Sequence, residues 1–194
     1  QLVSLKILQN TLLALRNTRD LLPLINEVWP ALTHRLAKGR DDHYVLLAAC
    51  DVADTVCRAG SAWMRQRVRD DLWVHFRRIL AEASRESLQR MSSECELVRR
   101  VICTMTTVVQ FVPLDDVVAW DLVWLALKVV DNRVLEPFVI VLLSEMMPVY
   151  GDKVWLIVAK LGRTATSPED IPDLGISVQG IRAPPNIAVL LGML

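Results

Sequence analysis

The chain has 194 residues, and its 22 basic and 22 acidic residues give a formal net charge of zero. This balance argues against a basic nucleic-acid interface, so no nucleic-acid partner is expected. The hydrophobic fraction of 53% is high, but no apolar run reaches the roughly 20 residues that a membrane span requires. The best run, residues 117–130, contains Asp121 and Lys128. We therefore expect a soluble protein with extra buried surface and no membrane partner.

Apolar residues recur every three or four positions from Leu2 to about Leu161, which predicts helices rather than strands. Ser93 with Glu96 forms a capping box, and Asp115 or Asp116 can cap a later helix. Pro30 should kink or divide the helix that contains it. Starting and ending residues of these kinds delimit eight predicted helices: 2–18, 21–38, 43–59, 62–88, 94–111, 115–130, 134–149 and 152–162.

The predicted helices form pairs that begin near residues 2, 43, 94 and 134. Their spacing of about 40–50 residues is typical of HEAT and armadillo repeats rather than of TPR or ankyrin repeats. The sequence therefore predicts an all-α, HEAT-like helical-repeat solenoid of about four helix pairs. Because the chain starts at Gln1 without a Met, we expect it to be a fragment of a longer array.

Three regions are expected along the chain. Residues 1–162 form the helical repeats, and residues 163–185 form a linker because proline and glycine accumulate there. Residues 186–194 are a short apolar tail segment, which could be one short helix or a strap that packs on the array.

Helix 62–88 has large apolar side chains away from its expected core stripe. At 100° per residue, Trp73 lies on the flank of the stripe, Val74 points away from it, and Trp63 lies off it at the helix start. His75 borders the stripe and is interpreted as a core-edge imidazole. Several off-core apolar groups together indicate a contact with another repeat or with a partner protein. The stripe itself consists of Val68, Leu72, Phe76, Ile79 and Ala83.

Helix 115–130 is apolar on nearly every side, because even the face between Asp121 and Lys128 carries Trp124 and Leu125. Charged residues number 28 in positions 1–100 but only 11 in positions 101–162, so the second half has few solvent-facing residues. We expect either the tail after residue 162 or a partner protein to cover it. The predicted partner-contact residues are Trp63, Trp73, Val74, Trp124, Leu125, Phe138, Met146 and Met147.

No sequence motif for phosphate binding, nucleophilic catalysis or a zinc protease occurs, so neither an enzyme nor a cofactor is expected. Cys50 and Cys57 are seven residues apart, and Cys95 and Cys103 are eight apart. Two helical turns separate the members of each pair by about 10 Å, too far for both to bind one zinc ion. Four cysteines in a chain of this length favour a reducing compartment, the cytosol or the nucleus.

Three consecutive segments carry a family resemblance: residues 21–36 with Leu-Pro-Leu and Trp-Pro-Ala-Leu, residues 44–57, and residues 60–73 with Gly-Ser-Ala-Trp-Met-Arg. Together they resemble the C-terminal HEAT region of the Tti-one scaffold subunit of the TTT (Tel-two, Tti-one, Tti-two) cochaperone complex. The resemblance covers about residues 20–90. It implies a non-enzymatic scaffold that binds the Tti-two and Tel-two subunits and helps mature PI3K-related kinases with Hsp90 and R2TP, in cytoplasm and nucleus.

Two alternatives remain open at this point. One is a different HEAT or armadillo-type adaptor, such as a transport receptor or a phosphatase scaffold, which would use the same surfaces for other cargo. The other is a helical enzyme or ligand-binding domain, which would need a polar pocket lined by groups such as His75, Asp121 or Glu145.

Overall fold

The computed structural model describes residues 2–15, 20–38, 42–83, 88 and 92–164. Most helix ends lie within a few residues of the prediction, but the helix predicted over 62–88 ends at Glu82, and the helices predicted over 134–149 and 152–162 form one kinked helix. No strand occurs in the described ranges, and none of their helices is long and apolar enough to span a membrane. The long helices are α1 (Leu2–Ala14), α2 (Leu21–Lys38), α3 (His43–Gly60), α6 (Ser93–Phe111), α7 (Asp116–Val129) and α8 (Glu136–Thr164). Between α3 and α6 lie η2 (Ser61–Met64), α4 (Arg65–Arg67), η3 (Val68–Leu72) and α5 (Trp73–Glu82).

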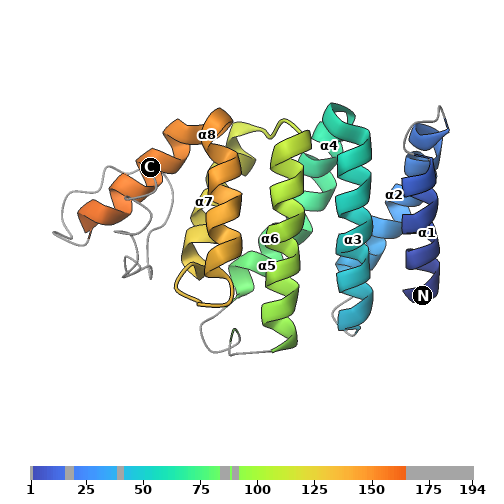
Figure 1. The fold of residues 1–194 in the computed structure, drawn as a ribbon, viewed down its shortest axis with the longest axis horizontal. Helices are drawn as coiled ribbons and strands as arrows, with labels where there is room; N and C mark the ends of the chain where they lie inside the picture. The colour runs from blue at the N-terminus through green and yellow to red at the C-terminus, as the bar shows by residue number, and fades with distance from the viewer. Residues whose placement is uncertain (1, 16–19, 39–41, 84–87, 89–91, 165–194) are drawn as a thin grey trace.

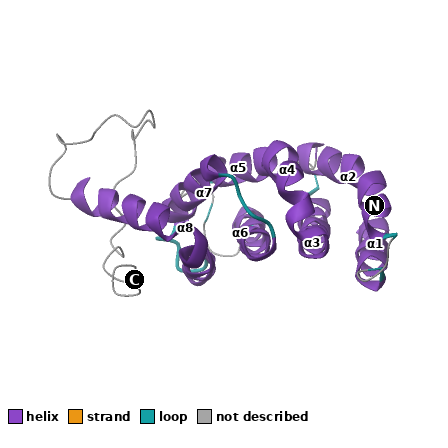
Figure 2. Cartoon of the chain, turned by 90° about the horizontal axis from the view of Figure 1, so that it is seen from above, coloured by secondary structure: helices purple, strands orange, loops and turns teal. Residues whose placement is uncertain are grey.

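The helices stack in two layers. One layer holds α1, α3, α6 and the first part of α8, and the other holds α2, α4, α5 and α7 (Figure 1). Seen from above, the stack curves, with the second layer on its outer side (Figure 2). Helix pairs begin at Leu2, His43, Ser93 and Glu136, so successive units are 41, 50 and 43 residues apart. The predicted all-α helical-repeat solenoid is therefore confirmed.

Two helix starts have side-chain caps: Asp42 before α3, and Ser92 before α6. Ser92 lies one residue ahead of the capping box predicted at Ser93 and Glu96, and Glu96 instead accepts hydrogen bonds from Arg99. The Ser92 hydroxyl accepts a hydrogen bond from the Cys95 amide at 3.0 Å, and the Asp42 carboxylate accepts one from the Val45 amide at 3.2 Å. Asp115 occupies the N-cap position of α7 without making a capping bond, because its carboxylate binds arginines instead. Pro30 does not divide α2, which continues through it.

The segment predicted as one helix over 62–88 changes its winding several times. It starts with the 3-10 turn η2, passes through α4, and then includes one π-helical stretch, η3. A π turn inserts an extra residue and rotates everything after it relative to a regular α-helix. As a result Trp73 and Leu80 join the predicted core residues Leu72 and Phe76, while Ile79 is only partly buried.

The predicted break near Gly151 appears as a kink in α8. Tyr150 has φ −122° and ψ 20°, outside the helical region. Its buried hydroxyl accepts a hydrogen bond from the Leu114 amide at 2.7 Å and donates one to the Leu114 carbonyl at 3.1 Å. Both polar groups of a buried loop residue are thus paired, which fixes the kink against the connection between α6 and α7.

The connection between α6 and α7 is also tied to the preceding unit. Arg65 Nε donates to Asp115 at 2.8 Å, Arg69 Nη1 donates to the same carboxylate at 3.2 Å, and the Ser61 hydroxyl donates to the Phe111 carbonyl at 2.9 Å. The bonds from Arg65, followed by those from Arg69, lower the pKa of Asp115. Polar contacts at this loop therefore join three successive units of the stack.

Candidate protein-interaction surface

Three of the eight predicted partner-contact residues lie in the core. Trp73 is 5% exposed, Leu125 is 8% exposed and Met146 is fully buried. The π turn in η3 rotates Trp73 inward, while Leu125 and Met146 face neighbouring helices of the stack. These three predictions are wrong, because a buried side chain offers no surface to a partner.

Neighbouring described helices cover most of the apolar surface of α7. Helix α7 packs against α5 on one side and α8 on the other, and most of its residues are buried as a result. Trp124, Phe138 and Met147 are partly buried and pack against the core. The Arg99 guanidinium covers the Phe138 ring at 5.2 Å from its centroid. Helices α5 and α8 thus cover much of α7, and Trp124, Phe138 and Met147 are only partly accessible.

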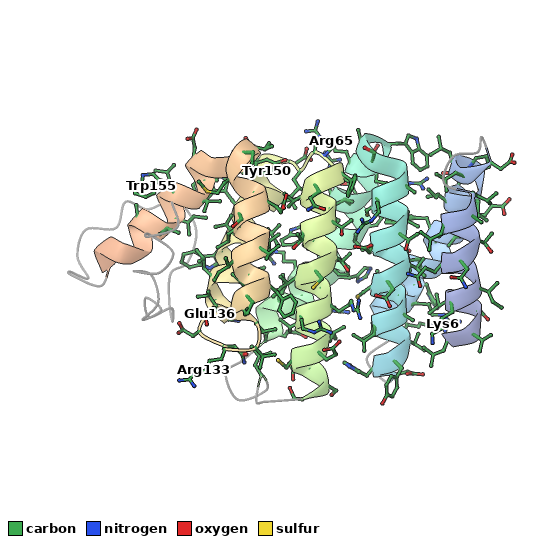
Figure 3. The ribbon with its side chains drawn as sticks, viewed as in Figure 1. Lys6, Arg65, Arg133, Glu136, Tyr150 and Trp155 are labelled. Atoms are coloured by element: carbon green, nitrogen blue, oxygen red, sulfur yellow. The ribbon has the colours of Figure 1, made fainter. Side chains whose placement is uncertain are left out.

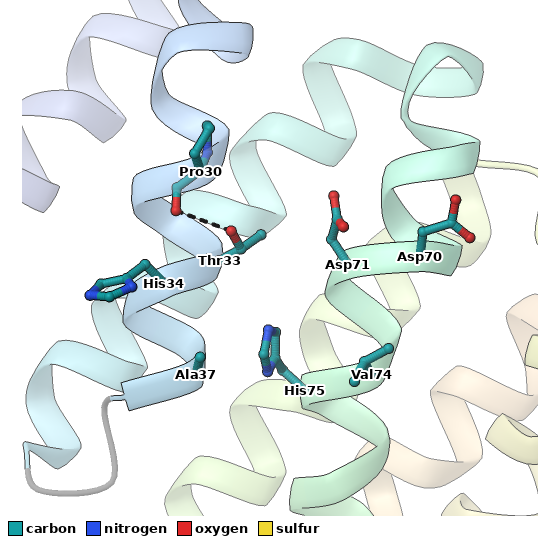
Figure 4. A pocket seen from close by; sticks show the side chains of 8 residues that line it. All are labelled: Pro30, Thr33, His34, Ala37, Asp70, Asp71, Val74 and His75. Carbon is teal, nitrogen blue, oxygen red and sulfur yellow. Dashed lines mark hydrogen bonds between the residues drawn. The ribbon is translucent and has the colours of Figure 1, made fainter.

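Trp63 and Val74 are the predicted residues that remain well exposed, at 42% and 57%. Val74 lines a shallow cleft of about 390 Å³ in the outer layer, between α2 and the η3–α5 segment (Figure 4). We call this feature the outer cleft. Its walls are Pro30, Thr33, His34 and Ala37 from α2, and Asp70, Asp71, Val74 and His75 from η3 and α5.

A stack of side chains holds the two walls of the outer cleft together. The Arg67 guanidinium lies 4.3 Å from the ring centroid of Trp63 and 5.8 Å from that of Trp29, and it donates a hydrogen bond to the Asn26 amide oxygen. Trp29 Nε1 donates to the Asp71 carboxylate at 2.6 Å. The cation–π contacts and this bond to an ionised acceptor fix the stack. The stack therefore presents an exposed tryptophan beside a cleft with a defined shape.

The lining of the outer cleft combines apolar side chains with carboxylates and histidines, and its Asp70 is ion-paired with Arg69. It contains the carboxylates Asp70 and Asp71 and no lysine or arginine. The hydrogen bond from Arg69 lowers the pKa of Asp70, so this group stays ionised at neutral pH. Pro30, Ala37 and Val74 supply apolar contact area. Such a lining suits a partner side chain with an apolar stem and a cationic end, as in lysine or arginine.

His75, in the wall of the outer cleft, is expected to make the free energy of unfolding depend on pH. Burial, followed by the nearby Arg78 charge, lowers its pKa from 6.5, while Asp71 opposes this shift. Because the folded protein favours the neutral imidazole, the unfolded chain takes up a proton first as the pH falls through about 6.5. We expect the free energy of unfolding to be highest above that pH and to decrease below it. The variant His75→Gln should show a weaker dependence of the free energy of unfolding on pH. Urea titrations at about pH 7.5 and about pH 5.5 measure this dependence. If the free energy of unfolding changed with pH equally in the parent and in the variant, His75 would not be its cause.

The part of the chain that the structure describes contains no group of three or more His, Cys, Asp or Glu side chains arranged to hold a metal ion. Cys50, Cys57, Cys95 and Cys103 are free thiols. Burial raises the pKa of Cys50 to about 12 and also raises that of Cys57. Both thiols therefore stay protonated, and their role is core packing.

The profile of the family described as the TTI1 C-terminal TPR domain matches residues 1–155. The chain belongs to this family. The match extends the Tti-one resemblance of residues 20–90 over almost all of the described helices, and it favours a TTT-type helical scaffold over a transport receptor or a phosphatase scaffold. Comparisons with curated proteins and with solved structures gave no match.

This Tti-one family chain differs in repeat length from the TPR motif after which the domain is described. Its units are 41–50 residues apart, whereas a TPR unit has about 34 residues. Helical repeats of both kinds typically serve as protein–protein interaction scaffolds. The chain therefore shares the architecture of a binding scaffold, with HEAT-like repeat lengths.

Exposed apolar side chains in two regions were not predicted from the sequence. Val3, Ile7, Leu13 and Leu22 are exposed on α1 and α2. Val149, Trp155 and Leu156 are exposed on α8, on either side of its kink. Helices α1 and α8 are rich in apolar residues all around, but sequence periodicity cannot tell which sides lack a neighbour. The outer cleft was missed for a related reason: it depends on how α2 and α5 sit side by side in the outer layer.

Proposed function

We propose that this chain is the part of a TTT cochaperone scaffold that binds the sister subunits Tti-two and Tel-two. In this role it helps to assemble and stabilise PI3K-related kinases together with Hsp90 and R2TP, in the cytoplasm and the nucleus. The observation that carries the proposal is the family match over residues 1–155. The helical-repeat architecture supports it, because such stacks present long surfaces to protein partners.

We propose further that the outer cleft and Trp63 form the contact with Tti-two. Tryptophan contributes strongly to the binding energy of many interfaces, and the contact with Arg67 holds the exposed Trp63 in place at the surface. Exposed apolar area beside ionised carboxylates gives the surface affinity and charge selectivity together. The π-helical stretch that shapes one wall is also a feature found often at functional sites.

The first experiment is size-exclusion chromatography with light scattering on residues 1–194, alone and mixed with Tti-two, Tel-two or both. A stable 1:1 complex with Tti-two supports both the scaffold role and the partner. A monomer that ignores both subunits would overturn the assignment of these partners.

A pair of variants tests the outer cleft itself. Val74→Arg places a bulky cation in the cleft and should repel a basic partner side chain, so we expect Kd for Tti-two to rise at least about tenfold. Val117→Arg is the matched control, because Val117 is also an exposed helical valine, 73% accessible, and lies outside the cleft. The free energy of unfolding of both variants should lie within about 0.5 kcal/mol of that of the parent. Equal affinities of the two variants, measured by isothermal titration calorimetry, would place the contact elsewhere.

A further inference from the structure

The segment of α8 after its kink exposes a patch of large apolar side chains. Val154, Ile157 and Val158 are buried on one side of this segment. Trp155 and Leu156 point the other way and are 50% and 55% exposed. Figure 3 shows Trp155 on the part of α8 that extends beyond the last stacked helix. We call Trp155 and Leu156 the end patch.

Nothing in the described chain covers the end patch. In the rest of the stack, each first-layer helix packs on the next one, as α1 does on α3 and α3 on α6. Helix α8 is the last described element, and among the described residues no further first-layer helix lies beside it. Leaving a tryptophan and a leucine half in water forgoes about 25 cal/mol for each Å² of apolar area that a cover would bury.

The chain itself supplies a segment of matching chemistry. Residues 186–194 read Asn-Ile-Ala-Val-Leu-Leu-Gly-Met-Leu, with seven apolar side chains and no charged one. These residues lie outside the described part of the structure. Residues 165–185 join them to α8 and include four prolines and two glycines.

The tether favours this segment over a separate molecule. A flexible chain of 21 residues has a typical end-to-end distance of roughly 25 Å, which reaches the end patch from the end of α8. Such a tether holds the segment at a local concentration of about a millimolar, well above that of most free partners. The exposed apolar side chains of α1 and α2 lie at the opposite end of the stack, so they are much harder to reach (Figure 1).

We propose that residues 186–194 dock on the end patch and cover the exposed side of α8 after its kink. The contact buries Trp155 and Leu156 beneath the apolar side chains of the tail. It gives the last described unit a cover like the one that each earlier unit receives from its neighbour. The proposal does not depend on which partner binds the outer cleft.

Hydrogen exchange with mass spectrometry on the full 194-residue chain tests the proposal. The double variant Leu190→Asp/Leu191→Asp should make backbone amides of residues 151–160 exchange about tenfold faster than in the parent. The matched control Ile176→Asp/Val178→Asp adds the same two charges to the connecting segment and should leave that exchange unchanged. Amides of α3 should exchange alike in all three proteins, which shows that the stack stays folded.

Two outcomes would overturn the proposal. In the first, residues 151–160 exchange equally fast in the parent and in the tail variant, so the tail does not cover the end patch. In the second, protection of these residues in the parent increases with protein concentration, which identifies a second copy of the chain as the cover. Protection that depends on Leu190 and Leu191 and not on concentration supports docking within one chain.

Discussion

Trp73→Ala is expected to lower the free energy of unfolding by about 3–5 kcal/mol, because it removes a large, buried aromatic side chain and leaves a cavity. The matched variant Trp63→Ala should cost only about 1 kcal/mol, since Trp63 is 42% exposed and its main contact is the cation–π stack with Arg67. Urea denaturation followed by far-UV circular dichroism measures both without relying on tryptophan emission.

The comparison of the two tryptophans tests the register set by the π turn. Regular helical winding through residues 68–72 would keep Trp73 on the flank of the core and make its removal mild. Similar losses for the two variants would therefore contradict the burial of Trp73. A large loss for Trp73→Ala alone supports the inward rotation that follows η3.

Leu125→Asp is expected to abolish most of the stability of the chain, because it places an unpaired carboxylate among the helices that enclose α7. A loss of more than about 4 kcal/mol is consistent with a buried, uncompensated polar or charged group. Thermal and urea unfolding of the purified variant measure the loss, if it folds at all.

Val117→Asp on the same helix is the control for Leu125→Asp. Val117 is 73% exposed, so the free energy of unfolding of its variant should lie within about 0.5 kcal/mol of that of the parent. If both aspartates were tolerated equally in the isolated chain, Leu125 would be a surface residue available to a partner. That result would restore the sequence-based interpretation of α7 as a contact helix.

The partly buried Trp124 illustrates how that interpretation arose. Apolar periodicity shows correctly that most of α7 is buried, but it does not identify the cover. The cover is α8 on one side and α5 on the other, and both contacts depend on the stacking of successive units. A substitution at Trp124 is therefore expected to lower the free energy of unfolding, and any loss of binding would follow in part from this loss of stability.

The outer cleft marks a similar division between local and long-range information. Trp63 and Val74 were identified as exposed from their positions around the helix, and both are exposed. Their connection with Trp29 and Asp71 was not foreseen, because the residues that meet belong to helices about 40 residues apart in the chain. Helical periodicity indicates which way a side chain points but not which distant helix it meets.

The sequence by itself determined the helices, most of their ends, their pairing into units and the family. These properties depend on local causes: apolar spacing, capping side chains such as Ser92, and prolines and glycines between helices. Only the tertiary structure decided which apolar faces are covered. Contacts between units determine the π turn at η3, the hydrogen bonds between Tyr150 and Leu114, and the packing of α8 on α7. Such contacts leave no periodic signal in the residues that make them.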